Sequence, residues 1–144
     1  MKKLILFMFI PLLIMLFSAI GLAMNLKTTS ESVNKTNKEY EYYLNKEIYG
    51  TEVTSLMNKA INENEKNKIA KDEKGYYIDD AKDSIRIELK MISVEKTYAM
   101  EEINNHDMNQ FLENFNLIKF RCTSIEYHKK TGKISRMIIE QIEY

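Results

Sequence analysis

The longest hydrophobic pattern along the chain is an uncharged apolar tract that runs from Leu4 to Met24. An α-helix rises about 1.5 Å per residue, so about 20 apolar residues cross a hydrocarbon core of roughly 30 Å. Proline, serine and glycine interrupt the tract once each, and membrane helices tolerate these residues. The tract therefore predicts a transmembrane anchor over residues 1–24, with the lipid bilayer as its partner.

The same tract also fits a secretory signal peptide. Lys2 and Lys3 form a basic start, and the small residues Gly21 and Ala23 lie where a signal peptidase would cut. The apolar run continues to Met24, beyond the length of about 15 residues that is usual for the apolar part of a signal. This favours a retained anchor, although both interpretations stay open. Under the positive-inside rule, both place the remaining chain outside the cytoplasm.

The polar residues 25–37 are typical of a stalk between a membrane and a domain over residues 38–144. Apolar positions then recur at helical spacing and predict a helix over residues 36–48, with Gly50 as its C-terminal cap. A second amphipathic helix begins after Thr51, which we expect to be its N-cap. Its apolar positions share one face: Val53, Leu56, Met57, Ala60 and Ile61.

Strict alternation of apolar and polar residues over 84–91, SIRIELKM, predicts a half-buried strand. A weaker strand is predicted over 96–103, where the sequence also fits the start of a helix. Residues 108–115 again show helical spacing and predict a short helix, with Asp107 or Asn105 as its N-cap.

The last part of the chain predicts a β-hairpin. Residues 118–128 and 134–142 are rich in β-branched and aromatic side chains, and Gly132 between them suits a left-handed turn position. The apolar residues change parity within the first strand, which a β-bulge near Thr123 and Ser124 would explain.

These elements predict an α+β fold: an N-terminal transmembrane helix followed by a small domain. In that domain, an antiparallel sheet of about four strands is packed by two to three helices. We expect one hydrophobic core beneath the sheet, which includes Val53, Met57, Ile87, Leu89, Phe111 and Phe115.

The composition removes several classes of function. The 21 basic residues balance 21 acidic ones, and the part after the apolar tract is slightly acidic, so we expect no nucleic-acid partner. A single cysteine, Cys122, permits neither an internal disulfide nor a lipid anchor after the tract. A bias toward Lys, Asn, Ile and Tyr is typical of an AT-rich bacterial genome.

No motif predicts a catalytic centre, a cofactor or a metal site. Cys122 has the parity of a buried strand position, and His128 follows it too far along the same strand to activate it. His106 and Asp107 supply only two metal ligands, which do not define a site. The acidic residues of the central connection are interpreted as solvated turn residues: Asp72, Glu73, Asp79, Asp80 and Asp83.

Four tyrosines are the candidate contact surface: Tyr40, Tyr42, Tyr43 and Tyr49. Four rings on about three helical turns exceed what one buried face needs, and exposed tyrosines are good contact residues.

The favoured hypothesis is a membrane-anchored, extracytoplasmic and non-enzymatic protein that binds another envelope protein, as a component of the bacterial envelope or of a secretion or pilus-like apparatus. The order of the elements resembles the layout of pilins and pseudopilins, but the chain has neither a motif of those proteins nor their processing site. One alternative is a secreted binding or inhibitor module. Another is a small extracytoplasmic hydrolase that uses Glu101 and Glu102 near His106. The sequence leaves the oligomeric state undetermined.

Overall fold

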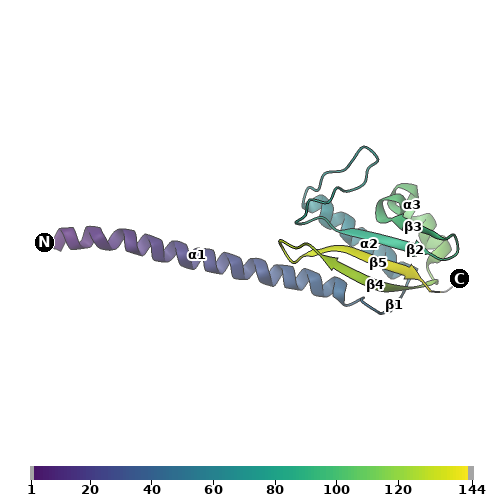
Figure 1. Cartoon of the computed structure of the whole chain (residues 1–144), viewed down its shortest axis with the longest axis horizontal. Helices are drawn as coiled ribbons and strands as arrows, with labels where there is room; N and C mark the ends of the chain where they lie inside the picture. Colours follow the sequence, from purple (N-terminus) through teal and green to yellow (C-terminus); the bar gives the residue numbers. More distant parts are fainter. Residues whose placement is uncertain (1, 143–144) are drawn as a thin grey trace. The chain divides into compact units, whose positions relative to one another are not determined.

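The computed structural model describes the backbone of residues 2–142 and the side chains of residue 11 and residues 13–142. The chain forms two compact units, which we call the N-terminal unit (Met1–Lys35) and the domain (Thr36–Tyr144). The elements follow one another as shown in Figure 1: α1 (Lys2–Glu41), β1 (Glu47–Tyr49), α2 (Gly50–Lys66), β2 (Arg86–Met91), β3 (Lys96–Ala99), α3 (Met100–Phe115), β4 (Lys119–Tyr127) and β5 (Ile134–Gln141).

Helix α1 continues without a break through the polar segment 25–37, whose conformation the sequence left open. Hydroxyl groups in this segment are satisfied within the helix, since Thr28 Oγ1 donates to the carbonyl of Met24 and Thr29 Oγ1 to that of Asn25, both at 2.9 Å. Among the described residues, α1 is the one helix long and apolar enough to cross a membrane, a criterion that a signal sequence also meets. The side chains of residues 4–10 and 12 in the predicted anchor lie outside the described part.

The domain contains one five-stranded sheet with the strand order β1-β4-β5-β2-β3. Strand β5 pairs antiparallel with β4 on one side and parallel with β2 on the other. The remaining pairs, β1 with β4 and β2 with β3, are antiparallel. The α+β class is confirmed, but the prediction of a purely antiparallel sheet of about four strands is wrong. The sheet is mixed because β5 lies between two strands of opposite direction.

Helices α2 and α3 pack the hydrophobic core, and the predicted core residues belong to it. Val53, Met57, Ile87, Leu89 and Phe111 are buried, and Phe115 packs against them while partly exposed. Two residues of α2, the polar Asn64 and the small Gly50, determine how this helix contacts the rest of the domain.

The fully buried Asn64 of α2 makes both amide hydrogen bonds to one residue. Its Nδ2 donates to the carbonyl of Ile85, and its Oδ1 accepts from the Ile85 N–H, each at 2.7 Å. At the other end of α2, a Cβ atom on Gly50 would lie 2.0 Å from the carbonyl oxygen of Phe115. The N-terminus of α2 therefore approaches the end of α3 closely enough to require glycine.

The predicted helix over 36–48 is wrong beyond residue 41. Helix α1 ends at Glu41, Asn45 adopts a left-handed backbone with φ of 60°, and Ile48 is buried in β1, paired with Phe120 of β4. The short strand thus places Ile48 in the core.

The predicted caps around α2 are also wrong. Gly50 begins the helix instead of closing the previous one, and Tyr49 precedes it as the N-cap residue. The Tyr49 N–H donates to the Glu52 carboxylate at 3.0 Å, so a side chain within the helix supplies the cap that we assigned to Thr51.

Other local predictions are confirmed. Strand β2 has the expected alternating burial, and the β4–β5 register shifts between Cys122 and Ser124, where we expected a bulge. Gly132 has φ of 67° in the hairpin turn. The weaker strand over 96–103 is divided, since its first four residues form β3 and the rest begin α3.

Candidate functional site

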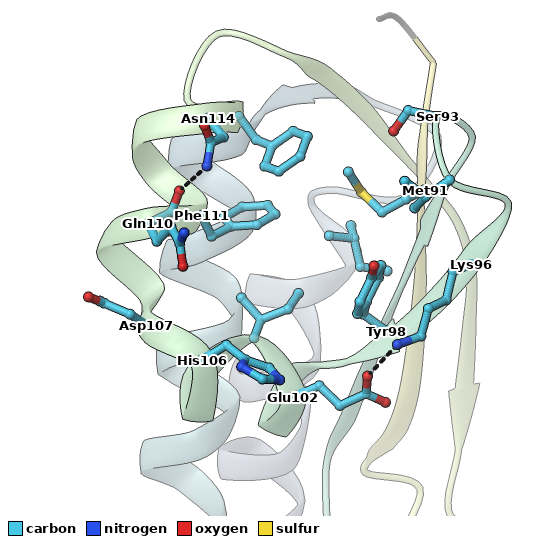
Figure 2. Close-up of a pocket in the computed structure, with 14 residues that line it drawn as sticks. Met91, Ser93, Lys96, Tyr98, Glu102, His106, Asp107, Gln110, Phe111 and Asn114 are labelled. Carbon is cyan, nitrogen blue, oxygen red and sulfur yellow. Dashed lines mark hydrogen bonds and ion pairs between the residues drawn. The ribbon is translucent and has the colours of Figure 1, made fainter.

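A cavity of about 450 Å³ lies between α3 and the β2–β3 hairpin (Figure 2). Its size and its mixed lining are typical of small-molecule or side-chain binding sites. Its lining residues include Leu89, Met91, Val94, Lys96, Tyr98, Glu102, Ile103, His106, Phe111 and Phe115.

The floor of the cavity is apolar and belongs to the hydrophobic core. Leu89 and Met91 come from the inward face of β2, and Ile103 and Phe111 come from α3. The ring of Phe111 stacks on that of Phe115 with their centroids 5.1 Å apart, and Figure 2 shows it pointing across the cavity toward Met91. An apolar group that entered the cavity would therefore meet carbon on most sides.

The rim of the cavity is polar. Lys96 Nζ pairs with Glu102 Oε2 at 3.2 Å and lies 4.2 Å from the ring centroid of Tyr98. His106 stands exposed beside them on α3. The Glu102 carboxylate is thus engaged by a lysine, which suits it to orienting a bound group.

The backbone of α3 changes direction at the cavity. Asp107 has φ of 105° and ψ of 103°, a conformation that non-glycine residues rarely adopt. Its Oδ1 accepts a hydrogen bond from the Asn109 N–H at 2.8 Å and so caps the second half of the helix, in agreement with the predicted role of Asp107. The side chain of Asp107 points away from the cavity in Figure 2.

The structure separates the residues of the hydrolase alternative. Glu102 and His106 line the cavity, whereas Glu101 is 4% exposed and accepts a hydrogen bond from the Tyr77 N–H at 3.1 Å. The second carboxylate oxygen of Glu101 is buried and has no hydrogen-bond partner. Glu101 therefore serves the packing of the 67–84 connection on α3 and not the cavity.

The four candidate tyrosines divide between surface and core. Tyr40 is fully buried, which removes its ring from any contact surface, and burial raises the pKa of its hydroxyl. Tyr43 packs partly against the core. Tyr42 is 61% exposed, with Lys46 Nζ 3.2 Å from its ring centroid, and Tyr49 is 47% exposed on β1. The exposed candidates are therefore Tyr42 and Tyr49.

Cys122 is fully buried, as predicted. Burial raises the pKa of its thiol to about 11, although the hydrogen bond to the Ser124 carbonyl acts in the opposite direction. A thiol with such a raised pKa stays protonated at neutral pH and is a poor nucleophile. The histidine that we weighed against it, His128, bonds instead to the Ser84 carbonyl at 2.7 Å.

The acidic connection contains one arrangement that sequence reasoning missed. Asp79 and Asp80 lie with the buried His128 so that one donor atom of each falls within 4.8 Å of the others. Although burial of its carboxylate opposes ionisation, hydrogen bonds from the N–H groups of Asp83, Ser84 and Lys82 hold the pKa of Asp80 well below its usual 3.8. The sequence gave no signal for this, because His128 follows these aspartates by almost 50 positions.

Comparison of the chain with protein-family models, with curated proteins and with solved structures found no match.

Proposed function

We propose that this chain is a membrane-anchored protein whose domain lies outside the cytoplasm and binds another protein of the bacterial envelope without catalysing a reaction. The proposal rests on the exposure of α1, because its large apolar side chains between Leu13 and Leu26 are exposed along the helix. Apolar side chains on every side of a helix need apolar surroundings, which a bilayer supplies. Lys2 and Lys3 favour a cytoplasmic N-terminus.

A tether supports the choice of a nearby protein as the partner. Attachment to the membrane raises the local concentration of other membrane-bound proteins, so that weak contacts become occupied. Tyr42 and Tyr49 supply exposed rings, which are enriched in protein interfaces. Neither ring belongs to the core cluster, so covering either ring needs no rearrangement of the core.

The location is tested by recovering the full chain from its native membranes. We expect mass spectrometry to find residues 4–24 retained and the chain to resist extraction by alkaline carbonate. An N-terminus at Met24 or Asn25 would instead support the secreted module. Protease added to intact spheroplasts should digest the domain, and protection of the domain would contradict an outside location.

The partner is tested by crosslinking in membranes followed by purification of the full chain. The double variant Tyr42→Ala, Tyr49→Ala should lose most of the crosslinked partner while its thermal unfolding stays close to that of the original chain. Ile78→Ala is a matched control, because Ile78 is 48% exposed and lies on the separate 67–84 connection. Unchanged partner recovery with the double variant would overturn this contact surface.

The cavity favours a second candidate function, the binding of a small apolar ligand. Its apolar floor and its Lys96–Glu102 rim suit an apolar molecule with one polar end. Val94→Trp should block ligand uptake by filling the mouth, since Val94 is 57% exposed and lines the cavity. Ile92→Trp is the control, because Ile92 is similarly exposed but is not among the lining residues. Turnover of any substrate that depended on His106 would favour the hydrolase instead.

A further inference from the structure

The loop of residues 79–84 is fastened to the turn of the β4–β5 hairpin by contacts between distant parts of the chain. His128 Nε2 bonds to the carbonyl oxygen of Ser84 at 2.7 Å, and Thr131 Oγ1 donates to the carbonyl of Lys82 at the same distance. Lys133 also pairs with Asp83. The position of His128 relative to the loop is therefore fixed from several sides.

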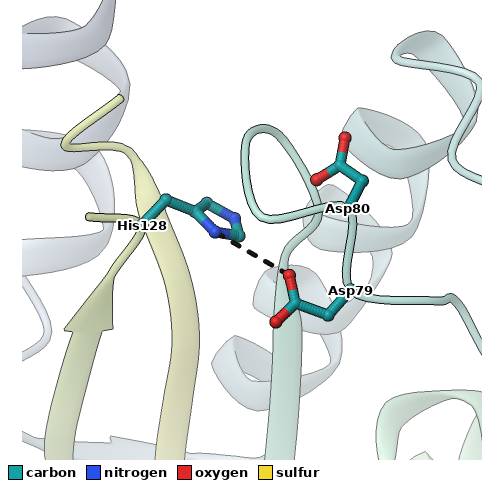
Figure 3. A group of neighbouring side chains, drawn as sticks. All are labelled: Asp79, Asp80 and His128. Atoms are coloured by element: carbon teal, nitrogen blue, oxygen red, sulfur yellow. Dashed lines mark ion pairs between the residues drawn. The ribbon is translucent and has the colours of Figure 1, made fainter. Parts of the chain in front are cut away.

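The hydrogen bond to Ser84 determines which nitrogen of His128 carries the proton. A carbonyl oxygen only accepts, so Nε2 must donate, and in the neutral imidazole Nδ1 then presents a lone pair. His128 is 6% exposed, and its Nδ1 lies 3.9 Å from Asp79 Oδ1. Figure 3 shows the ring pointing from the hairpin toward the two aspartates. In this neutral form two acceptor atoms face each other, at a distance that a cation between them would make favourable.

Both carboxylates are oriented by hydrogen bonds from their own loop. Asp79 Oδ1 accepts from the Ala81 N–H at 2.8 Å and from Ser84 Oγ at 3.2 Å. Asp80 Oδ1 accepts from three consecutive N–H groups, those of Lys82, Asp83 and Ser84, at 2.8 to 2.9 Å. Each carboxylate retains further lone pairs for a ligand.

We propose that Asp79, Asp80 and His128 bind one divalent transition-metal ion of the zinc class. An imidazole nitrogen with two carboxylate oxygens suits zinc and its neighbours, whereas calcium and magnesium prefer oxygen ligands throughout. In such sites the metal-binding histidine usually donates its other N–H to a backbone carbonyl or a carboxylate. The metal-binding carboxylates are themselves hydrogen-bonded. Three protein ligands leave one position of a four-coordinate ion for water.

The geometry allows the ligands to converge. Zinc binds nitrogen and carboxylate oxygen at about 2.0 to 2.2 Å, so the donor atoms must move closer than their present separations of up to 4.8 Å. The side chain of Asp79 is 69% exposed and can shift toward the ring, whereas the side chain of His128 is 4% exposed and stays in place. The nearby Lys133 is paired with Asp83, which reduces its repulsion of a cation. The site is independent of the anchor and of the tyrosine surface.

The test is a titration of the full chain in detergent with zinc by calorimetry, and with cobalt by visible absorption. We expect saturable binding of one ion per chain, which excess magnesium or calcium does not displace. Asp79→Asn should lower the association constant at least about tenfold, since loss of outer-shell partners alone costs 10- to 100-fold. Glu73→Gln is the control, because it removes the same charge from an exposed position of the 67–84 connection without removing a proposed ligand or the partner of Lys133.

A second measurement locates the ion without a variant that risks misfolding. Manganese should broaden the NMR signals of residues 79, 80 and 128 before those of His106. Absence of saturable zinc binding at millimolar concentration would overturn the proposal. Equal zinc affinity of Asp79→Asn and the original chain would also overturn it. So would displacement of zinc by calcium, or NMR broadening centred on His106.

Discussion

The N-terminal unit and the domain contain the same kinds of large apolar side chains in opposite surroundings. In α1, Met15, Phe17 and Leu26 are 67% to 73% exposed, whereas Met57 and Leu89 in the domain are at most 1% exposed. The apolar positions of α2 and β2 follow the helical and strand periods, so each element has one face to bury. Those of α1 lie on all sides. The domain therefore supplies its own apolar surroundings, whereas the large apolar side chains of the N-terminal unit remain exposed.

Charged residues placed in α1 should have the largest effect of the changes considered, and in the N-terminal unit alone. Ile14→Arg together with Phe17→Arg puts two guanidinium groups where the anchor would cross the bilayer centre. Each costs about 2.5 to 3.5 kcal/mol of insertion free energy, about 5 to 7 kcal/mol together. We expect the chain to leave the membrane fraction, while the denaturation midpoint of the domain stays unchanged. Membrane fractionation and urea unfolding measure the two effects, and a destabilised domain would show that the N-terminal unit contributes to its stability.

Truncation of a buried ring should have the next largest effect, and in the domain alone. Phe111→Ala should lower the free energy of unfolding by about 3 to 5 kcal/mol, measured by urea denaturation. Phe115→Ala is the matched comparison and should cost less, because the Phe115 ring is only partly buried. Neither variant should alter membrane attachment. A loss below about 1 kcal/mol for Phe111→Ala would contradict its place in the core.

The buried amide of Asn64 should have a smaller effect. Asn64→Ala leaves the N–H and the carbonyl of Ile85 without their partner, and each unsatisfied buried group costs about 1 to 3 kcal/mol. We expect the loss in free energy of unfolding to lie near the lower end of the combined cost of these two groups, because water can enter the space left by the side chain. Asn114→Ala is the control, since Asn114 is exposed and bonds only within α3 among the interactions described.

The smallest expected effect is that of Cys122→Ser, which replaces a buried thiol by a more polar hydroxyl. A cost of about 1 to 3 kcal/mol follows if the hydroxyl finds no good partner, and partner binding should be unchanged. The raised pKa of the thiol also predicts slow labelling of the native chain at neutral pH and rapid labelling once it is unfolded. Rapid labelling of the folded chain would contradict the burial of Cys122.

Features that depend on neighbouring residues could be predicted from the sequence. The alternation in β2, the helical face of α2 and the parity change at Cys122 each record burial within one element, so each appears as a local pattern. The turn at Gly132 is local for the same reason, because a left-handed backbone favours glycine at that position.

Features that depend on distant residues could not be predicted. The parallel pairing of β2 with β5 joins segments about 50 positions apart, and nothing within either strand specifies its direction. The end of α1 at Glu41 was missed because Tyr40 and Ile48 both reach the core, which helical spacing also allows. The candidate site was found in part, since His106 and Glu102 were named, whereas the meeting of His128 with Asp79 depends on tertiary structure alone.

The central position of β5 also determines when the domain can fold during synthesis. Residues 134–141 are the link between the β1–β4 pair and the β2–β3 pair, and they follow every other strand in the sequence. When α2, β2, β3 and α3 have already been synthesised, the two halves of the sheet are still separate, because β5 is not yet available to join them. Leu89 and Met91 stay in an incomplete core until β5 leaves the ribosome. The sheet therefore closes only after its last strand has been synthesised.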